Sequence, residues 1–110
     1  MNINEYQELA GRTINTKLKS DEVRIHALHG LAGEVGEVHS LFQKVYQGHE
    51  LDTEHLKKEI GDVLWFIAEL CTACGFELDD IAQMNIDKLK ARFPKGFDAE
   101  KSLNRVEGDI

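Results

Sequence analysis

The stretches LAGEVGEV (residues 31–38) and LKKEIGDV (residues 56–63) repeat one pattern, 25 residues apart. In each stretch an acid precedes an apolar residue, a glycine follows it, and a second acid precedes the next apolar residue. Apolar residues spaced by three and four mark one face of an α-helix. The repeat therefore predicts two similar amphipathic helices that pack against each other.

The apolar spacing continues on both sides of each stretch. It includes Leu28, Leu31, Val35, Val38, Phe42 and Val45 in the first segment, and Leu56, Ile60, Val63, Ile67 and Leu70 in the second. Such seams are typical of helical bundles, and we expect these residues to form the core. Because no segment alternates with a period of two, we expect no strand.

Capping signals divide the chain into four expected helices. These run roughly over 3–19, from the cap signal Ser20-Asp21 to about Tyr46, from Asp52 or Thr53 to about Ala73 with Gly75 as C-cap, and from Asp79 or Asp80 to just before Pro94. Residues 93–110 are expected to form an irregular tail. With 110 residues and no linker, the sequence predicts an all-α, four-helix bundle-type fold in a single domain covering residues 1–110.

The repeated acids predict a metal site. Glu34 and Glu37, like Glu59 and Asp62, are three residues apart and share a helical face beside the seam. If the seams pack, the four carboxylates converge, and two like charges at 4 Å repel by about 4 kcal/mol at an effective dielectric near 20. Either some acids stay protonated or a hard divalent cation lies between them, and oxygen ligands suit Mg²⁺ or Mn²⁺.

Two further observations refine this interpretation. A glycine inside a helix costs about 1 kcal/mol relative to alanine, so Gly36 and Gly61 indicate either a close helix approach or room for a ligand. Di-iron bundles need Glu-x-x-His, which this chain lacks, so oxygen chemistry is disfavoured. The alternative is that the acids form a solvated helix face.

The expected fourth helix carries candidate phosphate ligands. Asn85, Lys88 and Arg92 follow one another at spacings of three and four. Lysine can act as a point charge and arginine as a bidentate phosphate ligand. The alternative is a solvated basic helix end favoured by the helix dipole.

Together these residues resemble the MazG-like all-α nucleotide pyrophosphohydrolases, which are related to dimeric dUTPases, dCTP pyrophosphatases and phosphoribosyl-ATP pyrophosphohydrolases. The similarity covers nearly the whole chain. It rests on Asn4-Glu-Tyr-Gln7, Gly30 to Glu37, Gln47-Gly48-His49, Glu59 to Trp65, Asn85 to Leu89, Arg92-Phe-Pro-x-Gly-Phe97 and Ser102-x-Asn104-Arg105. Phe93 stands where a tyrosine is frequent, so any role of that hydroxyl is absent.

The resemblance implies an Mg²⁺-dependent cleavage between the α and β phosphates of a nucleoside triphosphate, giving a monophosphate and pyrophosphate. Glu34, Glu37, Glu59 and Asp62 would hold the metal, for which Mn²⁺ is a substitute, and Glu34 or Glu37 would be the general base. Lys88, Arg92 and Asn85 would bind the substrate. A specialised dUTP, dCTP or phosphoribosyl-ATP enzyme remains open, as does a metal-stabilised interaction module without turnover. Family members are homo-oligomers, either dimers or tetramers.

Composition limits the other classes of partner. The net charge of −7 disfavours nucleic-acid backbones and anionic membranes as partners. Without a signal peptide or membrane span, the expected location is the cytoplasm, so Cys71 and Cys74 should be reduced packing thiols. The five histidines are expected to be solvated or satisfied. Trp65 either packs in the core or stacks on a base as a substrate-binding residue.

Overall fold

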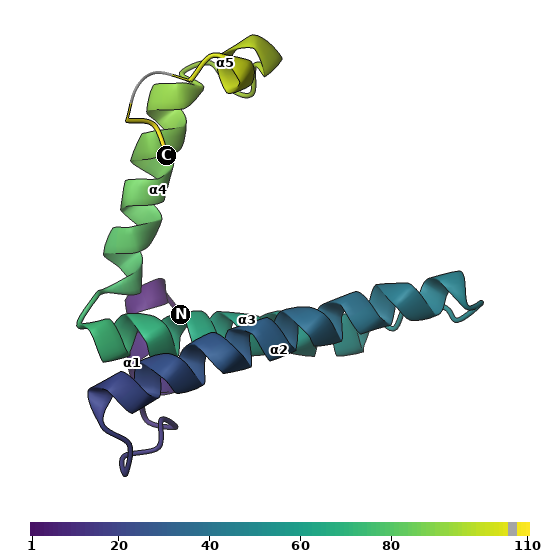
Figure 1. Cartoon of the computed structure of the whole chain (residues 1–110), viewed down its shortest axis with the longest axis vertical. Helices are drawn as coiled ribbons and strands as arrows, with labels where there is room; N and C mark the ends of the chain where they lie inside the picture. Colours follow the sequence, from purple (N-terminus) through teal and green to yellow (C-terminus); the bar gives the residue numbers. More distant parts are fainter. Residues whose placement is uncertain (106–107) are drawn as a thin grey trace. The chain divides into compact units, whose positions relative to one another are not determined.

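The computed structural model describes residues 1–105 and 108–110, and these residues form helices connected by turns and loops (Figure 1). The helices are α1 (Ile3–Gly11), α2 (Ser20–Tyr46), α3 (Thr53–Cys74), α4 (Leu78–Arg92) and α5 (Ala99–Leu103). Among the described residues the β-type pairing is confined to an isolated bridge between Pro94 and Gly96. The predicted all-α class is confirmed. Residues 1–77 and 78–110 form two compact units, which are described separately.

An antiparallel pair of long helices dominates the N-terminal unit. Figure 1 shows α2 and α3 lying side by side, joined by a short loop at one end, and α1 packs against α3. Local signals set the ends of α3: Asp52 Oδ1 accepts the His55 backbone N–H at 3.0 Å, and Gly75 ends the helix with a φ of +74°. The predicted bounds of this helix are correct to within one residue.

The end of α1 and the N-cap of α2 differ from the prediction. Asn2 caps α1, which ends at Gly11 instead of continuing to Lys19. The Thr13 hydroxyl donates to the Ala10 carbonyl at 2.8 Å, so this side chain satisfies a helix-end acceptor while the chain turns. At α2, Lys19 instead of Ser20 or Asp21 is the N-cap residue, and its N–H donates to the Glu22 carboxylate at 2.9 Å.

The predicted core seam is wrong in part. On α2, Leu31 and Val38 are half-buried, whereas four of the six seam residues are exposed: Leu28, Val35, Phe42 and Val45. On α3, Ile60 is exposed as well. The buried α2 residues are Val23, Ala27 and Leu41. A single partner helix, α3, covers only one edge of the wide apolar stripe on α2, so the rest of that stripe faces outward.

The close helix approach occurs at Gly30, not at the two glycines of the repeat. A Cβ atom on Gly30 would lie 2.1 Å from Cε1 of Phe66 on α3, so α2 can approach α3 here only without a side chain. A Cβ on Gly36 or Gly61 would have no atom within 4 Å. The sequence suggested either a close helix approach or room for a ligand at Gly36 and Gly61. Within this chain, the prediction of a close helix approach at these two glycines is wrong.

A buried acid joins the same two helices. Glu69 on α3 is 1% exposed, and both of its carboxylate oxygens accept from His26 Nδ1 on α2, at 3.0 and 2.9 Å. The ring of His26 also contacts Phe66, with 5.9 Å between centroids. The hydrogen bonds satisfy an acid that would otherwise be costly to bury.

The C-terminal unit begins with α4, which ends at Arg92, ahead of Pro94 as predicted. The segment expected to be an irregular tail contains α5. Its N-cap is Asp98, whose Oδ1 accepts from the backbone N–H groups of Glu100 and Lys101 at 2.9 and 3.3 Å. This cap stabilises a single short helical segment after the turn at Pro94.

No helix in the described part of the chain combines the length and the apolar character needed to cross a bilayer.

Candidate active site

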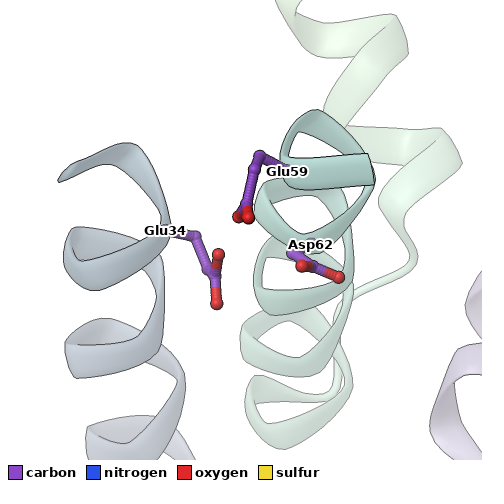
Figure 2. A group of neighbouring side chains, drawn as sticks. All are labelled: Glu34, Glu59 and Asp62. Carbon is purple, nitrogen blue, oxygen red and sulfur yellow. The ribbon is translucent and has the colours of Figure 1, made fainter. Parts of the chain in front are cut away.

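Three of the four repeated acids converge between α2 and α3. Figure 2 shows Glu34 reaching from α2 toward Glu59 and Asp62 on α3. One carboxylate oxygen from each residue lies within 4.8 Å of the other two. The spacing that puts Glu59 and Asp62 on one face of α3, and the packing of α2 along that face, together produce this cluster.

Glu37 lies outside this group, although its charge acts on Glu34. Glu34 is half-buried, whereas Glu37, one turn further along α2, is exposed. The structure brings together Glu34, Glu59 and Asp62 and leaves Glu37 at the edge.

A hydrogen bond between Glu34 and Glu59 shifts the pKa of both groups. The hydrogen bond to Glu59 raises the pKa of Glu34 to about 7, with further contributions from burial and from the charges of Glu59, Asp62 and Glu37. The same hydrogen bond lowers the pKa of Glu59, and a second one from His55 acts in the same direction. Protonated Glu34 therefore donates a hydrogen bond to ionised Glu59.

His55 is a functional candidate that the sequence interpretation missed, because it treated each histidine as solvated or satisfied. Its Nε2 donates to Glu59 Oε1 at 2.9 Å. The Glu59 side chain is 14% exposed and that of His55 is 47% exposed. The signal in the sequence was the spacing of four residues, which places the histidine directly over the acid on the same helix.

The donor set fits a hard divalent cation. All three groups are carboxylates, which Mg²⁺, Mn²⁺ and Ca²⁺ prefer over softer ligands. Ligand oxygens on opposite sides of a cation are about 4.2 Å apart for Mg²⁺ and about 4.8 Å apart for Ca²⁺. Oxygens within 4.8 Å of one another thus need only a small side-chain movement to contact Mg²⁺ together.

Aromatic side chains adjoin the acids on α1 and α3. Trp65 follows Asp62 by one turn, is half-buried, and donates from Nε1 to the Thr13 hydroxyl at 2.8 Å. Its ring contacts that of Phe66 edge-on, with 5.0 Å between centroids. Burial, together with the charge of Asp62, raises the pKa of Tyr6, so the phenol of α1 also lies near the cluster.

Comparison with known proteins assigns the chain to a family. Residues 24–97 match the MazG nucleotide pyrophosphohydrolase domain, which is about two thirds of the 110 residues. The chain belongs to the MazG nucleotide pyrophosphohydrolase family. The sequence is also similar to the "Gene 37 protein" of Mycobacterium phage L5, at 31% identity over 81 residues, covering 69% of this chain and 71% of the phage protein. No solved structure gives a significant match.

The MazG match spans the acids and also the predicted phosphate ligands on α4. In the C-terminal unit, Arg92 is paired with Asp109 through two hydrogen bonds of 2.6 Å, with the two side chains 11% and 8% exposed. The hydrogen bond from Arg92 lowers the pKa of Asp109. Lys88 donates to the main-chain oxygen of Ile110. Both cations thus contact oxygen acceptors of the chain itself, and their role toward phosphate, like that of Asn85, stays a prediction.

Proposed function

We propose that this MazG protein is an Mg²⁺-dependent nucleoside triphosphate pyrophosphohydrolase, which cleaves the α–β phosphate bond to give a nucleoside monophosphate and pyrophosphate. The observation that carries the proposal is the convergence of Glu34, Glu59 and Asp62 from two helices inside the MazG match. Three carboxylates in this arrangement suit a cation that binds phosphate oxygens. The same family membership supports a role in removing unwanted nucleotides.

Each acid has a distinct place in this proposal. Glu34, Glu59 and Asp62 hold the cation, which would polarise phosphate oxygens and lower the pKa of water. Glu37 lies beside the cluster without belonging to it, so its carboxylate remains available as the general base that orients the attacking water and accepts its proton. Glu34 is the other candidate for the general base, but a Glu34 carboxylate that binds the cation would be less able to accept a proton from water.

Residues of α4 and one aromatic side chain of α3 are further proposed substrate contacts. Arg92 and Lys88 would bind phosphate oxygens and stabilise the charge that develops on them. Arg92 already holds a carboxylate in a bidentate geometry, and arginine side chains often bind phosphate in the same geometry. Asn85 and Trp65 are the proposed contacts of the nucleoside.

A homo-oligomer fits the exposed apolar stripe of α2. Leu28, Val35, Phe42 and Val45 are between 41% and 53% exposed, and they lie along one helix at spacings of seven and three. A second copy of the chain that packs on this stripe would bury it, either in a dimer or in a tetramer. The proposed location of the assembly is the cytoplasm.

The reaction is tested with a panel of ribonucleotides and deoxyribonucleotides in the presence of Mg²⁺, with product identification by anion exchange and ³¹P NMR. The panel includes dUTP, dCTP and phosphoribosyl-ATP, because preferred hydrolysis of one of these nucleotides would identify a specialised enzyme. We expect a monophosphate and pyrophosphate, so release of orthophosphate would contradict the proposed bond. Asp62→Asn should reduce turnover to background, whereas Glu54→Gln, which changes an exposed acid on the same helix, should not.

A further inference from the structure

The histidine beside the acidic cluster has a contact that the proposed roles do not use. His55 Nε2 donates a hydrogen bond to Oε1 of Glu59, which lies one helical turn later on α3. We propose that His55 is a positioning residue of the metal site, which holds one oxygen of Glu59 and leaves the other oxygen to the cation. This inference rests on the proposed function and adds a residue to it.

The helix start keeps His55 in place. Asp52, the N-cap of α3, accepts the backbone N–H of His55 at 3.0 Å, so the histidine is anchored in the first helical turn. From this position its ring extends along the helix toward Glu59, and the side-chain contact measures 2.9 Å. The backbone anchor and the side-chain hydrogen bond thus act on the same residue.

The burial of Glu59 makes this contact hard for water to replace. The Glu59 side chain is 14% exposed, so most of it is shielded from water. A charge-assisted hydrogen bond to a partly desolvated carboxylate is stronger than one between neutral groups. It also removes freedom from a side chain with three rotatable bonds, and this ordering favours cation binding.

The hydrogen bond comes from the side of Glu59's own helix, outside the group formed with Glu34 and Asp62. On this proposal, a cation bound by the three acids would leave the hydrogen bond from His55 in place. Groups that hydrogen-bond to ligating carboxylates orient the ligand, and their removal typically costs about 10–100-fold in metal affinity or activity. His55 is in the position of such a group.

Direct metal binding tests the proposal without relying on turnover. Metal-free protein is titrated with Mn²⁺, and free Mn²⁺ is measured by electron paramagnetic resonance. His55→Ala should weaken binding by about 10-fold or more. His55→Gln should recover most of the affinity, because its Nε2 is as many bonds from the backbone as the Nε2 of histidine. His55→Asn places its amide nitrogen one bond closer and should remain weak.

A second histidine of the same helix pair provides the control. His26→Ala also removes a histidine–carboxylate contact, but at Glu69, which is not part of the cluster. We expect it to lower the melting temperature while leaving the Mn²⁺ affinity at the wild-type level. Circular dichroism of every variant establishes that the helices are retained at the temperature of the titration.

The outcomes separate this inference from the proposed function. Equal Mn²⁺ affinity of His55→Ala and the wild type would overturn it, and so would equal recovery by His55→Asn and His55→Gln. A wild-type protein that does not bind Mn²⁺ would overturn both the metal site and the role of His55. A wild-type protein that binds Mn²⁺ but hydrolyses no nucleotide would contradict the proposed function alone.

Discussion

Replacing Gly30 by alanine should destabilise the N-terminal unit, whereas the same change at Gly36 or Gly61 should stabilise it. At Gly30 the new Cβ would lie 2.1 Å from Cε1 of Phe66 and 2.4 Å from two further ring carbons. Carbon atoms in favourable contact are about 3.5 Å apart, so the ring has to move by about 1.4 Å. The ring is half-buried and contacts both Trp65 and His26, which restricts that movement.

The expected magnitude follows from two opposing contributions. Overpacking of a well-packed contact costs about 1–3 kcal/mol, and the contacts with three ring carbons favour the upper end of this range. Alanine returns about 1 kcal/mol through its higher helix propensity. We therefore expect Gly30→Ala to lose about 2 kcal/mol of unfolding free energy, and Gly36→Ala and Gly61→Ala, which face open space, to gain up to about 1 kcal/mol.

Urea unfolding followed by circular dichroism measures these differences, and about 2 kcal/mol corresponds to roughly 10 °C in melting temperature for a unit of this size. In a Phe66→Ala background the ring is absent, so Gly30→Ala should become neutral or stabilising. The reasoning is refuted if Gly30→Ala is as stable as Gly36→Ala. A destabilised Gly36→Ala would contradict the open space at that position and indicate another molecule against α2.

Three further predictions concern charge and assembly. Folding raises the pKa of Glu34 from 4.5 to about 7, so the folding stability of the metal-free protein should fall as the pH rises through this interval. Thermal melts at a series of pH values should show this decrease in melting temperature. Addition of Mg²⁺ or the substitution Glu34→Gln should abolish it. Asp109→Asn should free Arg92 and lower the KM for the nucleotide at unchanged kcat, while an unchanged KM would argue against phosphate binding by this arginine. Phe42→Asp should convert the proposed homo-oligomer to a monomer in sedimentation velocity with its helicity retained, and an unaltered oligomer would exclude this stripe as the interface.

The helices could be predicted where their ends depend on local signals. Asp52, Gly75 and Pro94 each act through neighbouring backbone groups, and the ends predicted from them agree with the structure. The end of α1 at Gly11 was not predicted, because it involves a threonine hydroxyl that competes for a helix carbonyl. Such a contact becomes visible only once the direction of the turn is known.

The periodicity of the sequence identified the apolar stripe of α2. It did not show which part of this stripe another helix of the chain covers. The spacing of Leu28, Val35 and Phe42 is that of a seam, and a seam requires a partner. In one chain that partner is α3, and it covers a neighbouring strip that includes Ala27 and Leu41. Sequence spacing does not state how many partners a helix has, so the stripe appeared to be core.

The sequence predicted which acids of the candidate site share a face of one helix, but it predicted contacts between the two helices less well. Glu59 and Asp62 share a face of α3, and Glu34 faces them as expected. Glu37 lies outside this group of three, and the spacing within α2 did not distinguish it from Glu34. The pairing of His26 with Glu69 depends on the register between the helices, and no spacing within one helix indicates it.

The protonation of the acidic cluster explains how the site can exist before a cation binds. Three ionised carboxylates within 4.8 Å would repel, and this repulsion would separate α2 from α3 at the site. The proton between Glu34 and Glu59 replaces one repulsive pair by a hydrogen bond, while His55 stabilises the charge that remains on Glu59. A divalent cation bound at the proposed site would displace this proton, so that Glu34 becomes an ionised ligand and the hydrogen bond to Glu59 is lost. With the pKa of Glu34 at about 7, the loss of its proton would cost little free energy near neutral pH, so the proposed site could exchange this proton for a cation.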